Sequence, residues 1–301
     1  MLTRKSLVRT ARVLCIGTAA TLVPMAVAPV ASAATLPVAC SETALQAAIN
    51  AANSTPAGDT LNLARGCRYQ LTTELPAVTS PIVVNGNSAT LVRTAGTFRI
   101  LTVNGGTLTL RSATLANGDA TGSPVANGAG GGVVVTGGGT LNLTGSVIRN
   151  NHAGFGGGLS VFNGSQVTVG QSVFTGNSAT QNGGGLVSDG AVTVGTSQFS
   201  GNTAGTAGGG IASIGVLTVG TSSIVRNTAQ TGAGLANGVP AAAGGTSTVT
   251  ASNISNNAAD ATNPGGVYNN GGTVTLRFSR VGANTPNNCL NSPSPVPGCL
   301  G

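Results

Sequence analysis

The sequence predicts an all-β protein that folds as a single-stranded parallel β-helix, a solenoid with about 25 residues per coil. Short sequence markers recur in one fixed order through most of the chain. Only 13 of the 301 residues are Lys or Arg and 6 are Asp or Glu, whereas 48 are glycine. After residue 55, no segment combines helical periodicity with helix-forming residues. Because strands and glycine-rich corners alone make up each coil, we expect one solenoid domain.

Four markers define the repeat. A glycine cluster precedes an aliphatic residue, as in Gly183-Gly184-Gly185-Leu186, and an apolar-polar-apolar triplet follows, as in Val192-Thr193-Val194. A serine and then an asparagine complete the coil, as Ser197 and Asn202 do. Stacked in successive coils, the asparagines should form a ladder whose side-chain amides hydrogen-bond along the axis. The triplet alternates with period two, so its outer residues should point into the core and its centre outward. The expected outward row consists of Thr109, Asn142, Thr168, Thr193, Thr218, Thr250 and Thr275.

The chain opens with a basic segment, an apolar stretch from Val13 to Val30, and Ala31-Ser32-Ala33. These are the three parts of a secretory signal peptide, so we expect residues 1–33 to be removed. The alternative is a transmembrane anchor, which needs roughly 20 apolar residues, and prolines interrupt this stretch. We therefore expect no transmembrane anchor in the mature chain and an extracellular or cell-surface location.

Residues 41–52 form the one segment that is typical of a helix, with Ser41 as a suitable N-cap. A solenoid exposes unpaired strand edges at its ends, so this helix is expected to cover the first coil. We place an N-terminal cap at residues 34–75, the coils at 76–286 and a C-terminal tail at 287–301. Less regular strands are expected in the first coils, at residues 60–63, 82–84 and 98–103.

Four cysteines remain after the expected cleavage, and an even number in an exported chain indicates disulfides. Two lie near each end of the chain, which favours Cys40–Cys67 and Cys289–Cys299 among the three possible connectivities. The competing interpretation is a lipoprotein acylated at Cys40, which would leave an odd thiol. A zinc site is disfavoured because the chain has one histidine.

These features resemble the bacterial secreted right-handed parallel β-helix repeat proteins of the pectin-lyase-like superfamily. The resemblance rests on the opening run from Cys40 to Leu71, on Asn287-Asn288-Cys289, and on repeats similar to those of polymorphic membrane proteins. It covers nearly all of the mature chain and implies a right-handed coil and export. It selects no activity, because the superfamily includes polysaccharide lyases, hydrolases and adhesins.

The six acidic residues give little sign of a catalytic pair, which for glycoside hydrolysis needs two carboxyl groups roughly 5–9.5 Å apart. In the repeat frame no two acids of the coils are neighbours, and Asp119 and Asp260 fall about five coils apart. His152, at the middle position of an Asn-x-Ala marker, has no acid beside it in that frame, and Asp189 is a turn residue before Gly190. We expect both to be dispensable. A cluster in the cap stays open, and its members would be Glu42, Asp59 and Glu74.

The expected function is that of an exported, non-catalytic β-helix protein that acts at or outside the cell surface, with a glycan or another surface component as its partner. Nucleic acid is excluded as a partner because clustered basic charge and interleaved aromatic residues are missing from the sequence. The alternative is a polysaccharide lyase or hydrolase with its site in residues 42–111. No catalytic, cofactor-binding or metal-binding residue is assigned, and no cofactor is expected. Five arginines there could meet an anionic polymer: Arg65, Arg68, Arg93, Arg99 and Arg111.

Overall fold

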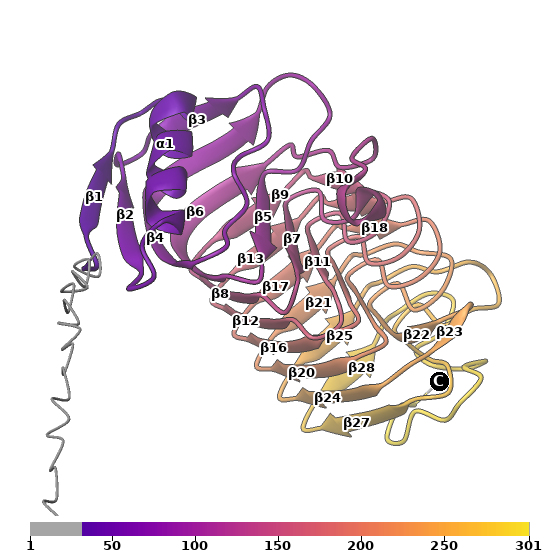
Figure 1. The fold of residues 1–301 in the computed structure, drawn as a ribbon. Helices are drawn as coiled ribbons and strands as arrows, with labels where there is room; N and C mark the ends of the chain where they lie inside the picture. Colours follow the sequence, from indigo (N-terminus) through magenta and orange to yellow (C-terminus); the bar gives the residue numbers. More distant parts are fainter. Residues whose placement is uncertain (1–31, 301) are drawn as a thin grey trace, which may run out of the picture. The chain divides into compact units, whose positions relative to one another are not determined.

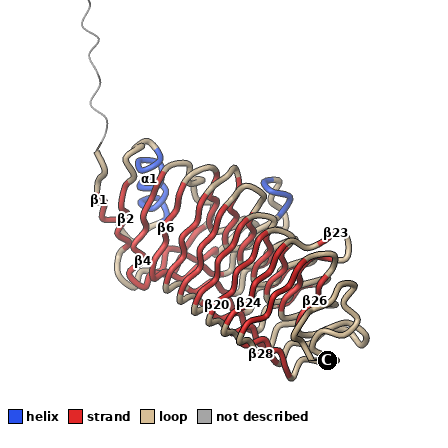
Figure 2. Tube along the Cα trace, turned by 90° about the horizontal axis from the view of Figure 1, so that it is seen from below, coloured by secondary structure: helices blue, strands red, loops and turns tan. Residues whose placement is uncertain are grey.

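The computed structural model describes residues 32–300, which form a right-handed parallel β-solenoid of about 10 turns (Figure 1). Each turn takes about 26 residues, and strands dominate the described part of the chain (Figure 2). The predicted fold class is therefore confirmed. The predicted signal peptide, residues 1–33, lies outside the described residues except for its last two positions, and it stays a prediction.

Each regular coil contributes one short strand to each of three faces. The first face carries the triplets, on β8 (Thr140–Thr144), β12 (Gln166–Gly170), β16 (Ala191–Gly195), β20 (Val216–Gly220), β24 (Thr246–Thr250) and β27 (Thr273–Arg277). The second face is formed by β9 (Val147–Arg149), β13 (Val173–Thr175), β17 (Gln198–Ser200), β21 (Ser223–Val225), β25 (Asn253–Ser255) and β28 (Arg280–Gly282). The third face is formed by β5 (Leu101–Asn104), β7 (Val133–Thr136), β11 (Leu159–Val161), β15 (Leu186–Ser188), β19 (Ile211–Ser213), β22 (Leu235–Val239) and β26 (Val267–Asn269).

Short elements connect the second face to the third. Three of them pair in parallel, namely β10 (His152–Ala153), β14 (Ser178–Ala179) and β18 (Thr203–Ala204). A 3-10 turn spans Val125–Gly128, and β23 (Ala242–Ala243) folds back antiparallel on β22. All other pairings between named strands are parallel, as the repeat predicts.

The N-terminal coils use longer strands. β4 (Pro81–Arg93) and β6 (Thr107–Ala116) each run through both the first and the second face, because they pair with strands of both. The strands β1 (Thr35–Val38), β2 (Asp59–Leu63) and β3 (Arg68–Leu71) precede them. Since β1 pairs in parallel with β2, solenoid pairing already begins inside the segment that was predicted to be a cap.

The predicted helix is α1 (Glu42–Asn53), and the side chain of Ser41 accepts a hydrogen bond from the Ala44 amide at 3.2 Å. Leu45 and Ile49 are buried on its inner side. The disulfide Cys40–Cys67 ties the start of the helix to the coil beneath it, with the pairing that the sequence favours.

The core consists of the inward residues of the strands. In three regular triplets the outer residues are buried and the central threonines Thr168, Thr193 and Thr218 are exposed, so the predicted register holds there. On the second face, Phe174 and Phe199 stack with ring centroids 4.5 Å apart. Inward side chains thus repeat from coil to coil in one continuous column.

One triplet was assigned to the wrong residues. The sequence suggested Val249-Thr250-Ala251, but Thr218 pairs with Thr248, and Thr250 pairs with Gly220. The inward residues of this coil are Ser247 and Val249, so Thr248 takes the place of Thr250 in the outward row. The cause is a longer loop, because this coil is 30 residues long where its predecessors are 25.

The asparagine ladder is confirmed. Asn177, Asn202 and Asn227 are at most 1% exposed, and each side-chain amide donates to the side-chain oxygen of the next asparagine at 2.9–3.0 Å. Each of these oxygens also accepts a backbone N–H from the coil before it. The amides also donate to backbone carbonyls, which satisfies polar groups that would otherwise be buried without partners.

The C-terminal tail continues the third face without regular strands. Gly265 and Val267 donate backbone hydrogen bonds to Asn287 and Asn288, and Ser294 donates to Asn269. The disulfide Cys289–Cys299 closes this segment, again with the pairing that the sequence favours. The boundaries at residues 76 and 287 stay our proposal for dividing the domain into cap, coils and tail.

Candidate functional site

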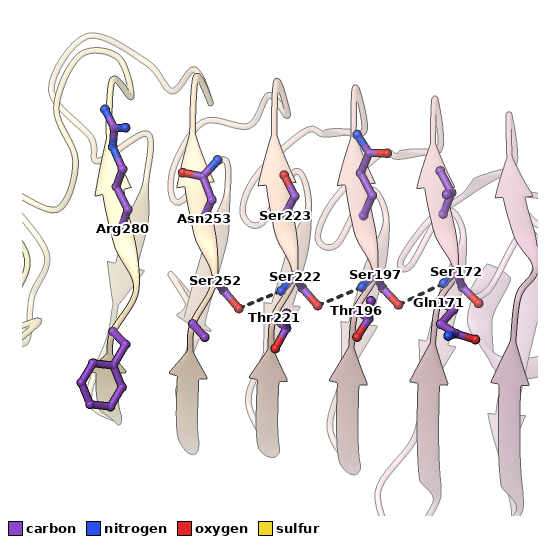
Figure 3. A pocket seen from close by; sticks show the side chains of 14 residues that line it. Gln171, Ser172, Thr196, Ser197, Thr221, Ser222, Ser223, Ser252, Asn253 and Arg280 are labelled. Atoms are coloured by element: carbon purple, nitrogen blue, oxygen red, sulfur yellow. Dashed lines mark hydrogen bonds between the residues drawn. The ribbon is translucent and has the colours of Figure 1, made fainter.

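A hollow lies along the corner between the first and second faces, and we name it the corner groove. Its volume is about 600 Å³. Figure 3 shows side chains from successive coils on its two sides. The lining residues are Gln171, Ser172, Val173, Thr196, Ser197, Gln198, Thr221, Ser222, Ser223, Ala251, Ser252, Asn253, Phe278 and Arg280.

The corner exists because one residue per coil adopts a left-handed backbone conformation. Its φ is 50° at Gln171, 48° at Thr196 and at Thr221, and 50° at Phe278. Residues other than glycine rarely adopt this conformation. Here it turns the corner side chain outward at the same place in each of these coils. The row of corner residues is therefore exposed along the edge of the groove.

A row of serines forms the floor of the groove and holds the corner together. Ser197 Oγ donates to the Gly195 carbonyl at 2.8 Å and accepts the Ser172 amide at 3.1 Å. The same contacts repeat from coil to coil, and Figure 3 draws the bonds that link each serine to the serine of the next coil. Ser252 belongs to this row, although the misassigned triplet hid it from the sequence analysis. These hydroxyls are mostly engaged within the protein.

The side chains beside the serines face solvent. Gln171, Thr196 and Thr221 lie on one side, and Ser223, Asn253 and Arg280 lie on the other. They offer hydroxyl and amide groups, and the guanidinium of Arg280 supplies the charge. Ala251 and Phe278 take the corner position in the last two coils of the groove. This corner was not among the sites predicted from the sequence, although the repeated serine three residues after each triplet marked its position.

The structure corrects the prediction that no acid lies beside His152. Asp119 and His152 are parallel bridge partners on adjacent coils, and His152 pairs with Ser178 on the next coil. His152 Nδ1 lies 2.7 Å from Ser178 Oγ. The repeat frame failed here because 33 residues separate Gly118 from Asn151, its ladder partner, so the coil before His152 was misplaced.

An acid, an imidazole and a hydroxyl in this order are the groups of a nucleophilic triad. Among the described residues, however, no hydrogen bond joins Asp119 to His152, and Asp119 Oδ1 instead accepts from the amide and hydroxyl of Thr121. Burial acts to raise the pKa of Asp119, but those two bonds and the charges of His152 and Arg93 outweigh it and lower the pKa. The row thus consists of a hydrogen-bonded contact between His152 and Ser178 beside an acid that is held by Thr121. That His152 is dispensable stays a prediction.

The acids of the N-terminal region each have their own partners. Glu42 accepts hydrogen bonds from the amides and hydroxyls of Thr72 and Thr73, which ties α1 to the following coil. Asp59 is 3% exposed and accepts the Ala34 amide at 2.8 Å. Glu74 accepts the Thr102 hydroxyl at 3.0 Å. The hydrogen bonds of these three acids therefore hold neighbouring segments of the fold together.

Arg99 is a further departure from expectation, because it is completely buried. Its Nη1 lies 3.8 Å from Glu74 Oε1, and its Nη2 donates to Ser123 Oγ at 3.0 Å. Burial lowers the pKa of this guanidinium, and Glu74 opposes the shift. Arg99 is therefore removed from any surface that could meet an anionic polymer, whereas Arg65, Arg68 and Arg111 are exposed.

Asp189 lies in the turn before Gly190, as predicted, and its side chain lines a second pocket on the outer side of the third face. Within residues 32–300, the acids, cysteines and histidine form no group of three that could hold a metal ion. Over the same range, no helix combines the length and apolar character needed to cross a membrane.

Comparisons with known proteins add no relative. No protein-family model matches the sequence, no curated protein matches it, and no solved structure matches the fold. The fold therefore rests on the structure itself, and membership of the pectin-lyase-like superfamily stays a prediction from the resemblance.

Proposed function

We propose that the protein is an exported, non-catalytic solenoid that binds an extended polysaccharide along the corner groove. The observation that carries the proposal is the polar lining on both sides of the serine row. Three of the five corner positions are polar, and so are four of the five positions opposite: Gln171, Thr196 and Thr221, and Gln198, Ser223, Asn253 and Arg280. Parallel strands stack about 4.8 Å apart, so these positions recur at the spacing of the coils. Successive sugar rings would then meet equivalent hydroxyl and amide groups on successive coils.

The C-terminal end of the groove supports an acidic polysaccharide in particular. The side chain of Phe278 is 96% exposed at the corner position, where other coils carry Gln171, Thr196 and Thr221. Its ring offers a flat apolar surface on which one face of a sugar can stack. Arg280, on the same coil, supplies a planar guanidinium that suits carboxylate or sulfate groups.

Binding without cleavage is proposed because of the residues that line the groove. None of the lining residues is Asp, Glu or His. Polysaccharide hydrolysis by the common route needs an acid and a base or nucleophile at the scissile bond. Export is supported by the two disulfides, which persist in oxidising compartments.

The test is binding and product release on a panel of acidic and neutral polysaccharides, with affinity electrophoresis and a reducing-end assay. We expect retention by acidic polymers, no product, and a loss of roughly tenfold in affinity for Phe278→Ala, on the scale of a lost stacking contact. Leu290→Ala is the matched control, because Leu290 is also an exposed apolar residue and lies outside the groove. Equal retention of Phe278→Ala and the parent chain, or release of product, would overturn the proposal.

A further inference from the structure

A second pocket lies on the outer side of the third face, and its volume is about 240 Å³. Its floor comes from β11 and β15, where Ser160 and Val187 face outward. A volume just below the roughly 300–1,000 Å³ of typical ligand sites suits a small molecule rather than a polymer. The pocket is lined by Ala126, Asn127, Ala129, Phe155, Ser160, Phe162, Asn182, Val187, Asp189, Ile214 and Val239.

The walls of the pocket are mostly apolar, and they are built by equivalent positions of successive coils. On one side, Phe162, Asp189 and Ile214 each follow a third-face strand and donate a backbone hydrogen bond to the coil before. On the other side, Phe155 and Asn182 precede the third-face strands. Asp189 thus lies between the apolar residues Phe162 and Ile214 of the neighbouring coils. Asn182 likewise lies beside Phe155, which occupies a matching position in the coil before.

Both polar residues present acceptors. Asn182 Oδ1 is buried and has no hydrogen-bond partner within the described part of the chain. Asp189 is the only charged residue among those that line the pocket. Desolvation raises the pKa of its carboxyl, although the residue as a whole is exposed. Native proteins rarely leave a buried acceptor unpaired, because the lost hydrogen bond with water is costly.

We propose that this pocket binds a small organic cation with an apolar body, whose ammonium group donates to Asp189 and Asn182. Phe155 and Phe162 would contact the apolar body, and Val187 would lie beneath it, because these side chains line the same pocket. The two acceptors belong to residues that precede and follow β15, and both residues line the pocket together with Val187. An anion is disfavoured because the pocket offers it a carboxylate and an amide oxygen.

The test uses three probes of similar shape and different charge: 2-phenylethylamine, 2-phenylethanol and 3-phenylpropionate. Titration calorimetry on the purified full chain should show the amine binding most tightly and the carboxylate least. Asp189→Asn should weaken amine binding about tenfold or more, since a charge-assisted hydrogen bond is lost, and should leave the alcohol within about twofold. Phe155→Ala should weaken the amine and the alcohol alike.

Asp260→Asn is the control, because it removes an exposed carboxylate that lies outside the pocket. Phe278→Ala should leave amine binding unchanged, which separates this site from the corner groove. Thermal unfolding of each variant checks that the solenoid is intact. Equal binding of amine and alcohol, tighter binding of the carboxylate, binding of no probe, or an unchanged amine affinity in folded Asp189→Asn would each overturn the proposal.

Discussion

The regular coils and the N-terminal coils provide partners for their buried polar groups in different ways. In the regular coils, buried polar groups are satisfied by side chains that repeat in register, such as Asn177, Asn202 and Asn227. In the N-terminal coils, buried polar side chains have individual partners, as Arg99 has Glu74 and Ser123. The ladder contact recurs in neighbouring coils, whereas the contacts of Arg99 belong to one place in the fold. The difference predicts how each region responds to substitution.

The largest effect should come from the core of the regular coils. Val194→Asp places an unpaired charge at a site that is 1% exposed, and it should lower the free energy of unfolding by at least about 4 kcal/mol. Thr193→Asp, one residue away on the exposed side, should change it by less than about 0.5 kcal/mol. Urea titration of both variants measures the contrast, and similar losses at the two positions would show that the register is wrong.

The asparagine ladder should come next. Asn202→Ala removes an oxygen that accepts from the amide and side chain of Asn177 and a donor to the Phe174 carbonyl. These groups are buried, so we expect a loss of about 3 kcal/mol in the free energy of unfolding. Asn163→Ala, at an exposed turn, is the matched control and should be nearly neutral. A ladder variant as stable as the control would mean that the ladder adds no stability.

The smallest of the three effects should fall in the N-terminal coils. Glu74→Gln keeps the acceptor for Thr102 and removes the charge that faces buried Arg99. Breaking a fully buried ion pair costs about 3–5 kcal/mol, and because the side chain of Glu74 is 32% exposed we expect about 2 kcal/mol. Asp260→Asn serves as the charge-matched control in the same urea titration. No loss relative to that control would show that Arg99 does not depend on Glu74.

The sequence was informative wherever the period was constant. The inward and outward residues of the regular triplets and the asparagine ladder followed from the period. The helix followed from its N-cap and apolar face, and the disulfides from an even number of cysteines in two local pairs. It was misleading wherever a coil changed length. The longer loop before Thr248 shifted one triplet, and the long coil after Gly118 hid the contact between Asp119 and His152.

The two pockets also differ in how closely their residues follow the repeat period. The serine row of the corner groove follows the period apart from Ser252, which lies in the longer coil, so its other members could be found by repeating the frame. The third-face pocket depends on departures from the period, since Asp189 and Asn182 stand among apolar neighbours. Single departures look like turn residues in a sequence. Asn182 and Asp189 flank one strand, β15, and the cavity beside them is completed by residues of the neighbouring coils. Arg99 escaped prediction for a similar reason, because its burial depends on a partner 25 residues away.

The C-terminal tail gives the solenoid a defined length. Asn284 donates its backbone N–H and its side-chain amide to Asn288 Oδ1, so the last rung of the ladder is received by the tail. The amide of Asn288 turns to the Leu300 carbonyl, 2.9 Å away, and not toward a further coil. In a fibre of stacked molecules, the first coil of the next copy would have to occupy this position. The tail therefore covers the position at which a further coil would continue the ladder.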